Sequence, residues 1–208
     1  MMQQKKVVIF IGFMICMNVV YGCGSLKTPH LEKQYYDLNL DMQRSSNYIN
    51  KGGSLLVKEF SINPTFDSHC LVYRIDKNEY VYDYYNEFVY YPAKIISDKI
   101  AETLYGSAYF ISALTKEQVD IKYRLSGKIL QLYGDFQDSN APKAIIEIRI
   151  ILEEKRDKIF QKVISNTYRG SEAISSAAPD DLFEGWNSGL SKNIIQFINE
   201  FAVLIKED

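Results

Sequence analysis

The sequence is poor in residues that carry cross-linking or catalytic chemistry: it has three cysteines, two histidines and one tryptophan. Cys16 lies in an apolar leader and Cys23 at its end, which leaves Cys70 without an internal disulfide partner. The cysteine spacing also matches no zinc site. The domain therefore has to be held together by burial of its core, and we interpret Cys70 as a small core residue.

The charge balance gives no reason to expect nucleic-acid binding. The formal net charge is −2, and loss of Lys5 and Lys6 with the leader would take it to −4. Nucleic-acid-binding domains are usually basic, because they neutralise phosphates.

Recognisable catalytic motifs are also missing. His30 lies in a segment that reads as a tether and His69 in a turn, and we interpret both as surface histidines. The sequence has neither a Gly-x-Ser-x-Gly elbow nor a phosphate-binding loop. Asp180 and Asp181 are better explained by helix capping than as an acid–base pair. The sequence thus predicts no enzyme, no metal and no cofactor, and a secreted hydrolase with an unusual site at His69 is the weakest alternative.

The N-terminus has the three parts of a secretory signal. A positive start with Lys5 and Lys6 precedes an apolar run over residues 7–17. The run ends in a lipobox, Val20-Tyr21-Gly22-Cys23, in which a small residue precedes the cysteine and only Tyr21 is bulkier than usual. We expect cleavage between Gly22 and Cys23 and a lipid on Cys23.

An uncleaved transmembrane anchor is the alternative interpretation of this leader. A spanning helix needs about 20 apolar residues, and Asn18 and the Gly-Cys-Gly-Ser break come too early for that. Several acyl chains on one cysteine would give stable membrane attachment where a single chain is marginal. Gly24 follows Cys23, which in enterobacterial-type sorting permits transfer to the outer membrane.

These features predict three regions. Residues 1–22 form a signal peptide, residues 23–34 a lipidated tether and residues 35–208 a single domain. The domain would be held by its lipid in the cell envelope, on the periplasmic face of the outer membrane.

Apolar residues at a spacing of two predict strands over most of the domain. A polar connection at residues 76–78 suggests a hairpin, and the last three strands should form an antiparallel meander joined by a charged turn at 153–158. The predicted strands cover residues 35–40, 54–62, 71–75, 79–85, 123–133, 144–152 and 159–168.

Two segments have helical spacing instead. One runs from Pro92, suited to a first-turn position, to Gly106 as a stop. The other covers residues 182–205, with Asp181 as the cap of a capping box and Glu184 three residues later. We therefore expect an α+β fold: one mostly antiparallel sheet with two amphipathic helices packed on one face.

Tyrosine is abundant, with 16 residues. Tyr80, Tyr82 and Tyr84 share one face of a predicted strand, and Tyr85, Phe88, Tyr90 and Tyr91 follow them. Cross-strand packing beneath a helix is the first interpretation of this density. The alternative is an exposed aromatic surface that contacts a partner or an acyl chain, with Tyr80, Tyr82, Tyr84 and Phe88 as candidate contacts.

The stretch over residues 71–104 resembles the ABC-type transport auxiliary lipoprotein family. In that family a Val-Tyr-Arg strand, here Val72-Tyr73-Arg74, is followed by a tyrosine-bearing strand, an aromatic residue, a proline and a helix with regularly spaced leucines or isoleucines. The family usually has tryptophan where Phe88 stands. The leader, the Tyr35-Tyr36-Asp37-Leu38 opening strand, the length and the closing helix also agree with it.

This resemblance implies a non-enzymatic accessory subunit that works beside Mce-domain proteins and ABC transporter subunits. Such systems are linked to the movement of phospholipid or other hydrophobic cargo between the two membranes. The resemblance implies no ATP site in this subunit and leaves homo-oligomers open. A structural or assembly lipoprotein of another outer-membrane export complex is the alternative, because it shares every feature except the 71–104 pattern.

Overall fold

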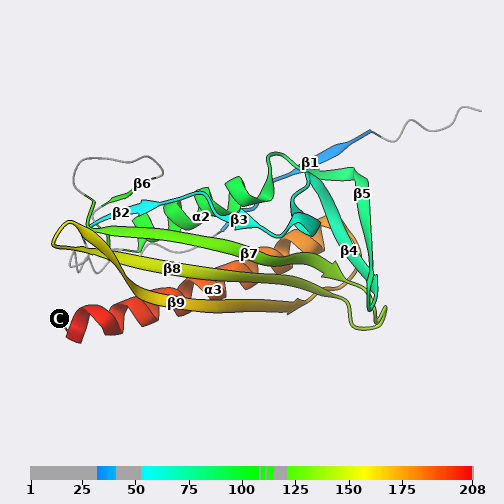
Figure 1. Cartoon of the computed structure of the whole chain (residues 1–208). Coiled ribbons are helices and arrows are strands. Elements are labelled where there is room, and N and C mark those ends of the chain that lie inside the picture. The colour runs from blue at the N-terminus through cyan, green and yellow to red at the C-terminus, as the bar shows by residue number, and fades with distance from the viewer. Residues whose placement is uncertain (1–31, 41–52, 108, 111, 115–120, 208) are drawn as a thin grey trace, which may run out of the picture. The chain divides into compact units, whose positions relative to one another are not determined.

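Three long strands, several short ones and two helices build the domain (Figure 1). The computed structural model describes residues 32–40, 53–107, 109–110, 112–114 and 121–207. The predicted signal peptide and most of the predicted tether lie outside these residues. The elements are β1 Gln34–Tyr36, β2 Ser54–Val57, β3 Ser61–Ile62, η2 Pro64–Phe66, β4 Cys70–Asp76, β5 Glu79–Phe88, α2 Pro92–Gly106, β6 Ser112–Leu114, β7 Tyr123–Asp135, β8 Lys143–Arg156, β9 Ile159–Ala173 and α3 Pro179–Glu207.

The predicted antiparallel meander is confirmed as β7, β8 and β9. In β8 the alternate residues Ile146, Ile148 and Ile150 are completely buried, as expected of a sheet with one covered face. The predicted charged turn is shorter than six residues, since β8 and β9 are joined by Asp157 and Lys158 alone. Both have positive φ angles, 49° and 72°, as the type I′ hairpin turn requires.

The prediction of a mostly antiparallel sheet is wrong, although the α+β class holds. Among the described residues the sheet is mixed, and five of its eight strand pairings are parallel. β2, β3 and β4 pair in turn with β7, each parallel to it, while β6 is parallel to β2 and β1 to β5. The physical reason is connectivity: these strands reach their neighbours through longer connections, one of which contains α2, and such connections allow parallel pairing.

Both helices cover the same face of the sheet (Figure 1). The predicted helix over residues 92–106 is confirmed as α2. The predicted cap of the last helix is wrong, because α3 begins at Pro179 and places Asp181 inside the first turn. There Asp181 accepts a hydrogen bond of 2.7 Å from the Ser176 hydroxyl. Neither α2 nor α3 is long and apolar enough to cross a membrane.

The predicted strand over residues 54–62 is interrupted between β2 and β3. Phe60 is buried there, and its ring occupies the space that a side chain at position 127 of β7 would need. The Phe60 N–H donates to the Ser97 hydroxyl of α2 at 2.8 Å. Gly127 thus lets Phe60 lie between the sheet and α2, which explains the glycine in the middle of a long strand.

Candidate functional site

The chain enters the domain next to the end of β5. Gly22 and Cys23, the predicted cleavage and lipidation residues, lie outside the described residues. Within them, the Lys33 ammonium forms an ion pair with the carboxylate of Glu87. β1 follows at once and pairs in parallel with the last residues of β5, with Tyr35 opposite Glu87. The first described residues are therefore tied to the strand that carries the predicted tyrosine ladder.

The three ladder tyrosines differ in exposure along β5. The ring of Tyr80 is partly buried and meets Phe66 and Tyr133 edge to face, with centroids 6.0 and 5.7 Å away. Tyr82 is 39% exposed, and its hydroxyl donates to the Thr65 carbonyl at 3.0 Å. Tyr84 is 66% exposed. The ladder thus begins in packing against η2 and β7 and ends in solvent.

Phe88 belongs to the core. It is 2% exposed and its ring lies 5.2 Å from that of Phe183 and 5.5 Å from that of Trp186, both on α3. Direct contact with a partner in this region would therefore involve Tyr82 and Tyr84.

A bulge in β5 lies between the ladder and Phe88. Leu71 of β4 pairs with Asp83, and the preceding residue of β4 pairs with Glu87, so residues 84–86 have no counterpart on β4. The Asp83 carboxylate organises the bulge by accepting from the backbone N–H groups of Tyr85 and Asn86, at 3.0 and 3.1 Å, and from the Asn86 amide at 2.8 Å. Bulges of this kind redirect side chains.

A fourth hydrogen bond to Asp83 comes from the Tyr73 hydroxyl at 3.0 Å. Burial by itself would raise the pKa of Asp83, but the four donors outweigh it and hold the pKa below its usual value. In the same contact, burial and the neighbouring carboxylate raise the pKa of Tyr73. Asp83 therefore stays ionised, as an acceptor for the bulge.

The bulge is one part of a tyrosine-rich surface at this end of the sheet. Four tyrosines besides Tyr84 are between 50% and 63% exposed here: Tyr35, Tyr85, Tyr90 and Tyr91. Tyr35 was not a candidate from the sequence. Its orientation follows from that of its neighbour. The ring of Tyr36 stacks on that of Phe183, with centroids 5.2 Å apart. Because alternate strand residues point to opposite faces, Tyr35 points the other way.

Two residues with reactive side chains, His69 and Cys70, lie near this surface. His69 Nδ1 lies 3.0 Å from the Phe88 carbonyl, and its ring lies 4.1 Å from that of Tyr91. Cys70 is a buried free thiol. Within the described ranges, no group of three or more His, Cys, Asp or Glu side chains could hold a metal ion.

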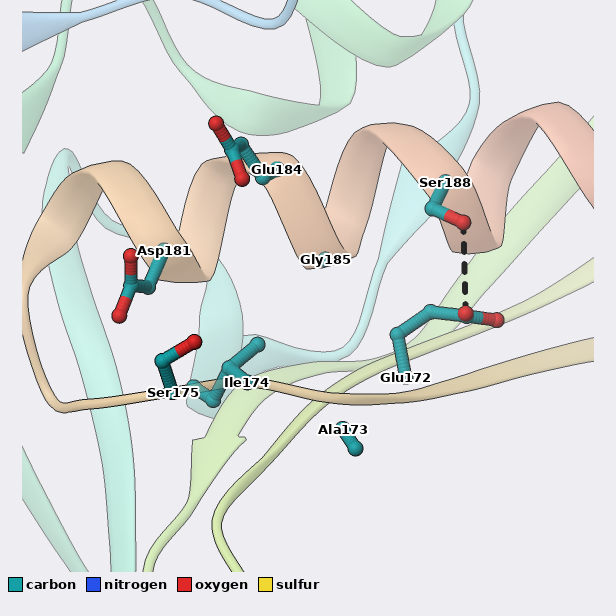
Figure 2. Close-up of a pocket in the computed structure, with 8 residues that line it drawn as sticks. All are labelled: Glu172, Ala173, Ile174, Ser175, Asp181, Glu184, Gly185 and Ser188. Atoms are coloured by element: carbon teal, nitrogen blue, oxygen red, sulfur yellow. Dashed lines mark hydrogen bonds between the residues drawn. The ribbon is translucent and has the colours of Figure 1, made fainter.

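A separate pocket of about 210 Å³ lies between the end of β9 and the start of α3. Figure 2 shows the carboxylates of Asp181 and Glu184 extending from the helix, and Glu172 from the strand. Glu172 accepts from the Ser188 hydroxyl at 3.3 Å and from Lys192 at 2.6 Å. Ligand pockets are usually about 300–1,000 Å³ and mostly apolar. This one is small, and three carboxylates line it.

The fold is similar to that of solved proteins. A crystal structure of a Xanthomonas campestris protein of family DUF330 matches with a TM-score of 0.70 and 15% identity, over 84% of this chain and 97% of that chain. A crystal structure titled only as an uncharacterized protein matches with a TM-score of 0.65 and 12% identity, over 82% of this chain and 99% of that one. Neither a family model nor a curated protein matches the sequence. At these identities the comparisons show that the chain shares the fold of a DUF330 family protein.

Proposed function

We propose that this chain is a lipid-anchored, non-enzymatic accessory subunit of an Mce-associated ABC-type transport system for lipids or other hydrophobic cargo. The comparisons concern the fold alone, so the proposal depends on the leader and on the resemblance of residues 71–104. Its role would be positional: the lipid on Cys23 holds the domain at a membrane, and the domain contacts the transport assembly.

The observation that carries the proposal is that the resembling stretch forms one continuous substructure. Residues 71–104 span the β4–β5 hairpin and most of α2, without interruption by another strand. Figure 1 shows this hairpin at the end of the sheet away from the C-terminal end of α3. A resemblance in sequence thus corresponds to a distinct part of the fold, on which Tyr82 and Tyr84 are exposed.

The hairpin is fixed to the rest of the sheet by an ion pair. Arg74 of β4 donates from Nε and Nη2 to the two carboxylate oxygens of Asp135 at the end of β7, at 3.2 and 2.5 Å. The same guanidinium lies 4.9 Å from the centre of the Tyr133 ring. A bidentate pair with a stacked arginine holds a defined geometry. The hairpin can therefore present Tyr82 and Tyr84 in fixed positions.

Affinity purification of the full-length lipoprotein from detergent-solubilised membranes tests the proposal. We expect an Mce-domain protein or an ABC transporter subunit to co-purify. If Tyr84 is a central contact, Tyr84→Ala should lower recovery at least about tenfold, since interface tyrosines often contribute 2 kcal/mol or more. Tyr105→Ala is the matched control, because Tyr105 is 54% exposed but lies near the end of α2.

Recovery of a clean monomer with neither partner would contradict the proposal. Recovery of an outer-membrane export component in their place would select the assembly-lipoprotein alternative. The genes beside this one provide an independent check, because transport subunits of one system are commonly encoded together.

A further inference from the structure

Four tyrosines surround the point at which the chain enters the domain. We call Tyr35, Tyr85, Tyr90 and Tyr91 the tether-side surface; each is at least half exposed. Tyr35 lies on β1, Tyr85 in the β5 bulge, and the other two between the end of β5 and the start of α2. Val89, 41% exposed, lies among them in the chain. Exposed aromatic side chains gathered in this way mark interaction sites more often than isolated ones do.

The backbone under the tether-side surface is well bonded. The Tyr85 N–H donates to the Asp83 carboxylate, and the Val89 N–H donates to the Tyr36 carbonyl at 2.9 Å. Tyr91 packs its ring against His69. The tyrosines are therefore exposed because ordered backbone directs them outward.

Several charged side chains next to the tether-side surface are paired. Lys33 binds Glu87, Lys94 binds Asp98 at 2.6 Å, and Asp37 lies 3.9 Å from Lys99. The carboxylate of Asp83 is directed inward to its four donors. Such pairing lowers the electrostatic cost of approaching an anionic bilayer, since these four carboxylates have a cation or a set of N–H and O–H donors beside them.

Chain length places this surface close to the anchoring membrane. Lys33 lies ten positions after Cys23 in the chain. Fully extended, this segment spans at most about 35 Å at roughly 3.3–3.6 Å per residue. A lipid on Cys23 would therefore keep this end of the domain within reach of the bilayer, and a tether this short gives a weak second contact a high effective concentration.

We propose that the tether-side surface lies in the headgroup layer of the membrane that holds the lipid anchor. Tyrosine suits this layer because its ring is apolar and its hydroxyl can remain hydrated. The contact would orient the domain so that β1, the β5 bulge and the start of α2 face the lipid. The inference rests on the lipid anchor of the proposed function and adds to it the face of the domain that meets the bilayer.

Tryptophan fluorescence of the lipidated full-length protein in vesicles tests this orientation. The sequence has a single tryptophan, Trp186, which is completely buried and gives the same background in each variant. Tyr85→Trp adds a probe on the tether-side surface. Tyr105→Trp adds a probe at a position of similar exposure on α2. Tyr105 lies about 20 Å along the helix from Pro92, at a rise of 1.5 Å per residue. The vesicles contain phosphatidylethanolamine and phosphatidylglycerol brominated near the carboxyl end of the acyl chains.

We expect the added tryptophan of Tyr85→Trp to emit at shorter wavelength and the brominated lipid to quench most of its fluorescence. The added tryptophan of Tyr105→Trp should be quenched hardly at all. Equal quenching of both probes, or quenching of neither in protein that floats with the vesicles, would overturn the orientation and leave the anchor intact. Protein that fails to float would overturn the anchor and the orientation together. Because no transport partner is present, none of these outcomes depends on the co-purification result.

Discussion

Asp83 shows how one side chain can determine a local surface. Its carboxylate accepts four hydrogen bonds, three of them from residues of the bulge itself. Without these bonds the backbone N–H groups of Tyr85 and Asn86 would have to find other acceptors, and Tyr85 would lose its fixed position. The exposed position of Tyr85 thus depends on the hydrogen bonds that the Asp83 carboxylate accepts.

Replacing Asp83 with asparagine should destabilise the fold by about 1–3 kcal/mol, the range for hydrogen bonds to a charged acceptor and for donors left unsatisfied. Urea unfolding at neutral pH measures the change. Asp67→Asn, at an exposed aspartate of the same chain, is the control and should leave the midpoint almost unchanged. Equal effects of the two substitutions would mean that the bulge does not depend on Asp83.

The carboxyl groups of Asp83 and Asp135 predict that the stability of the fold depends on pH. The folded-state pKa values of Asp83 and Asp135 lie below their ordinary value of 3.8, through hydrogen bonds that outweigh burial. A carboxyl group with a lowered folded pKa contributes stability that is complete above its unfolded pKa and is lost as pH falls through the folded pKa. Unfolding midpoints should therefore decrease as pH falls below about 3.8, and Asp83→Asn should make this decrease shallower.

At the scale of elements, the close contact between α3 and β9 leaves no room for a side chain. Gly170 of β9 faces Gly189 of α3, and a Cβ atom on Gly170 would lie 2.5 Å from the Cα atom of Gly189. The contact is between backbones, so no flexible side chain can move aside. The helix approaches the sheet this closely only because both positions are glycine.

Gly170→Ala should therefore cost about 1–3 kcal/mol of stability, as overpacking of a well-filled core does. Chemical unfolding followed by circular dichroism measures it. The adjacent Ser171→Ala is the matched control, because Ser171 is exposed on the same strand and its change should stay within about 0.5 kcal/mol. A Gly170→Ala protein as stable as the control would show that α3 can move away from β9 without loss.

The elements also show what periodicity can predict. Both ends of α2 were predicted correctly, because proline at its start and glycine at its end are local signals. The three long strands were found from their apolar spacing of two, although all three extend beyond their predicted ends. β6 and η2 were missed, since a segment of three residues is too short for a repeated helical or strand pattern to show.

At the scale of the whole molecule, attachment depends on one residue. Cys23→Ser should move the protein from the membrane fraction to the soluble fraction, because the acyl chains that hold it would be absent. Fractionation and immunoblotting measure the shift, with Cys16→Ser in the leader as the control. A Cys23→Ser protein that stays in the membrane would favour the uncleaved anchor over the lipobox.

Local sequence patterns determined the long elements, the absence of recognisable catalytic motifs and the expected lipid attachment, because each depends on residues close together in the chain. Strand direction and the exposure of individual tyrosines were decided by tertiary structure alone. β2, β3 and β4 become parallel neighbours of β7 through connections that no local pattern describes. Likewise Phe88 is buried and Tyr85 exposed within one short segment. α3 covers Phe88, and the register of β5 against β4 leaves Tyr85 in the bulge, so both outcomes depend on residues of other elements.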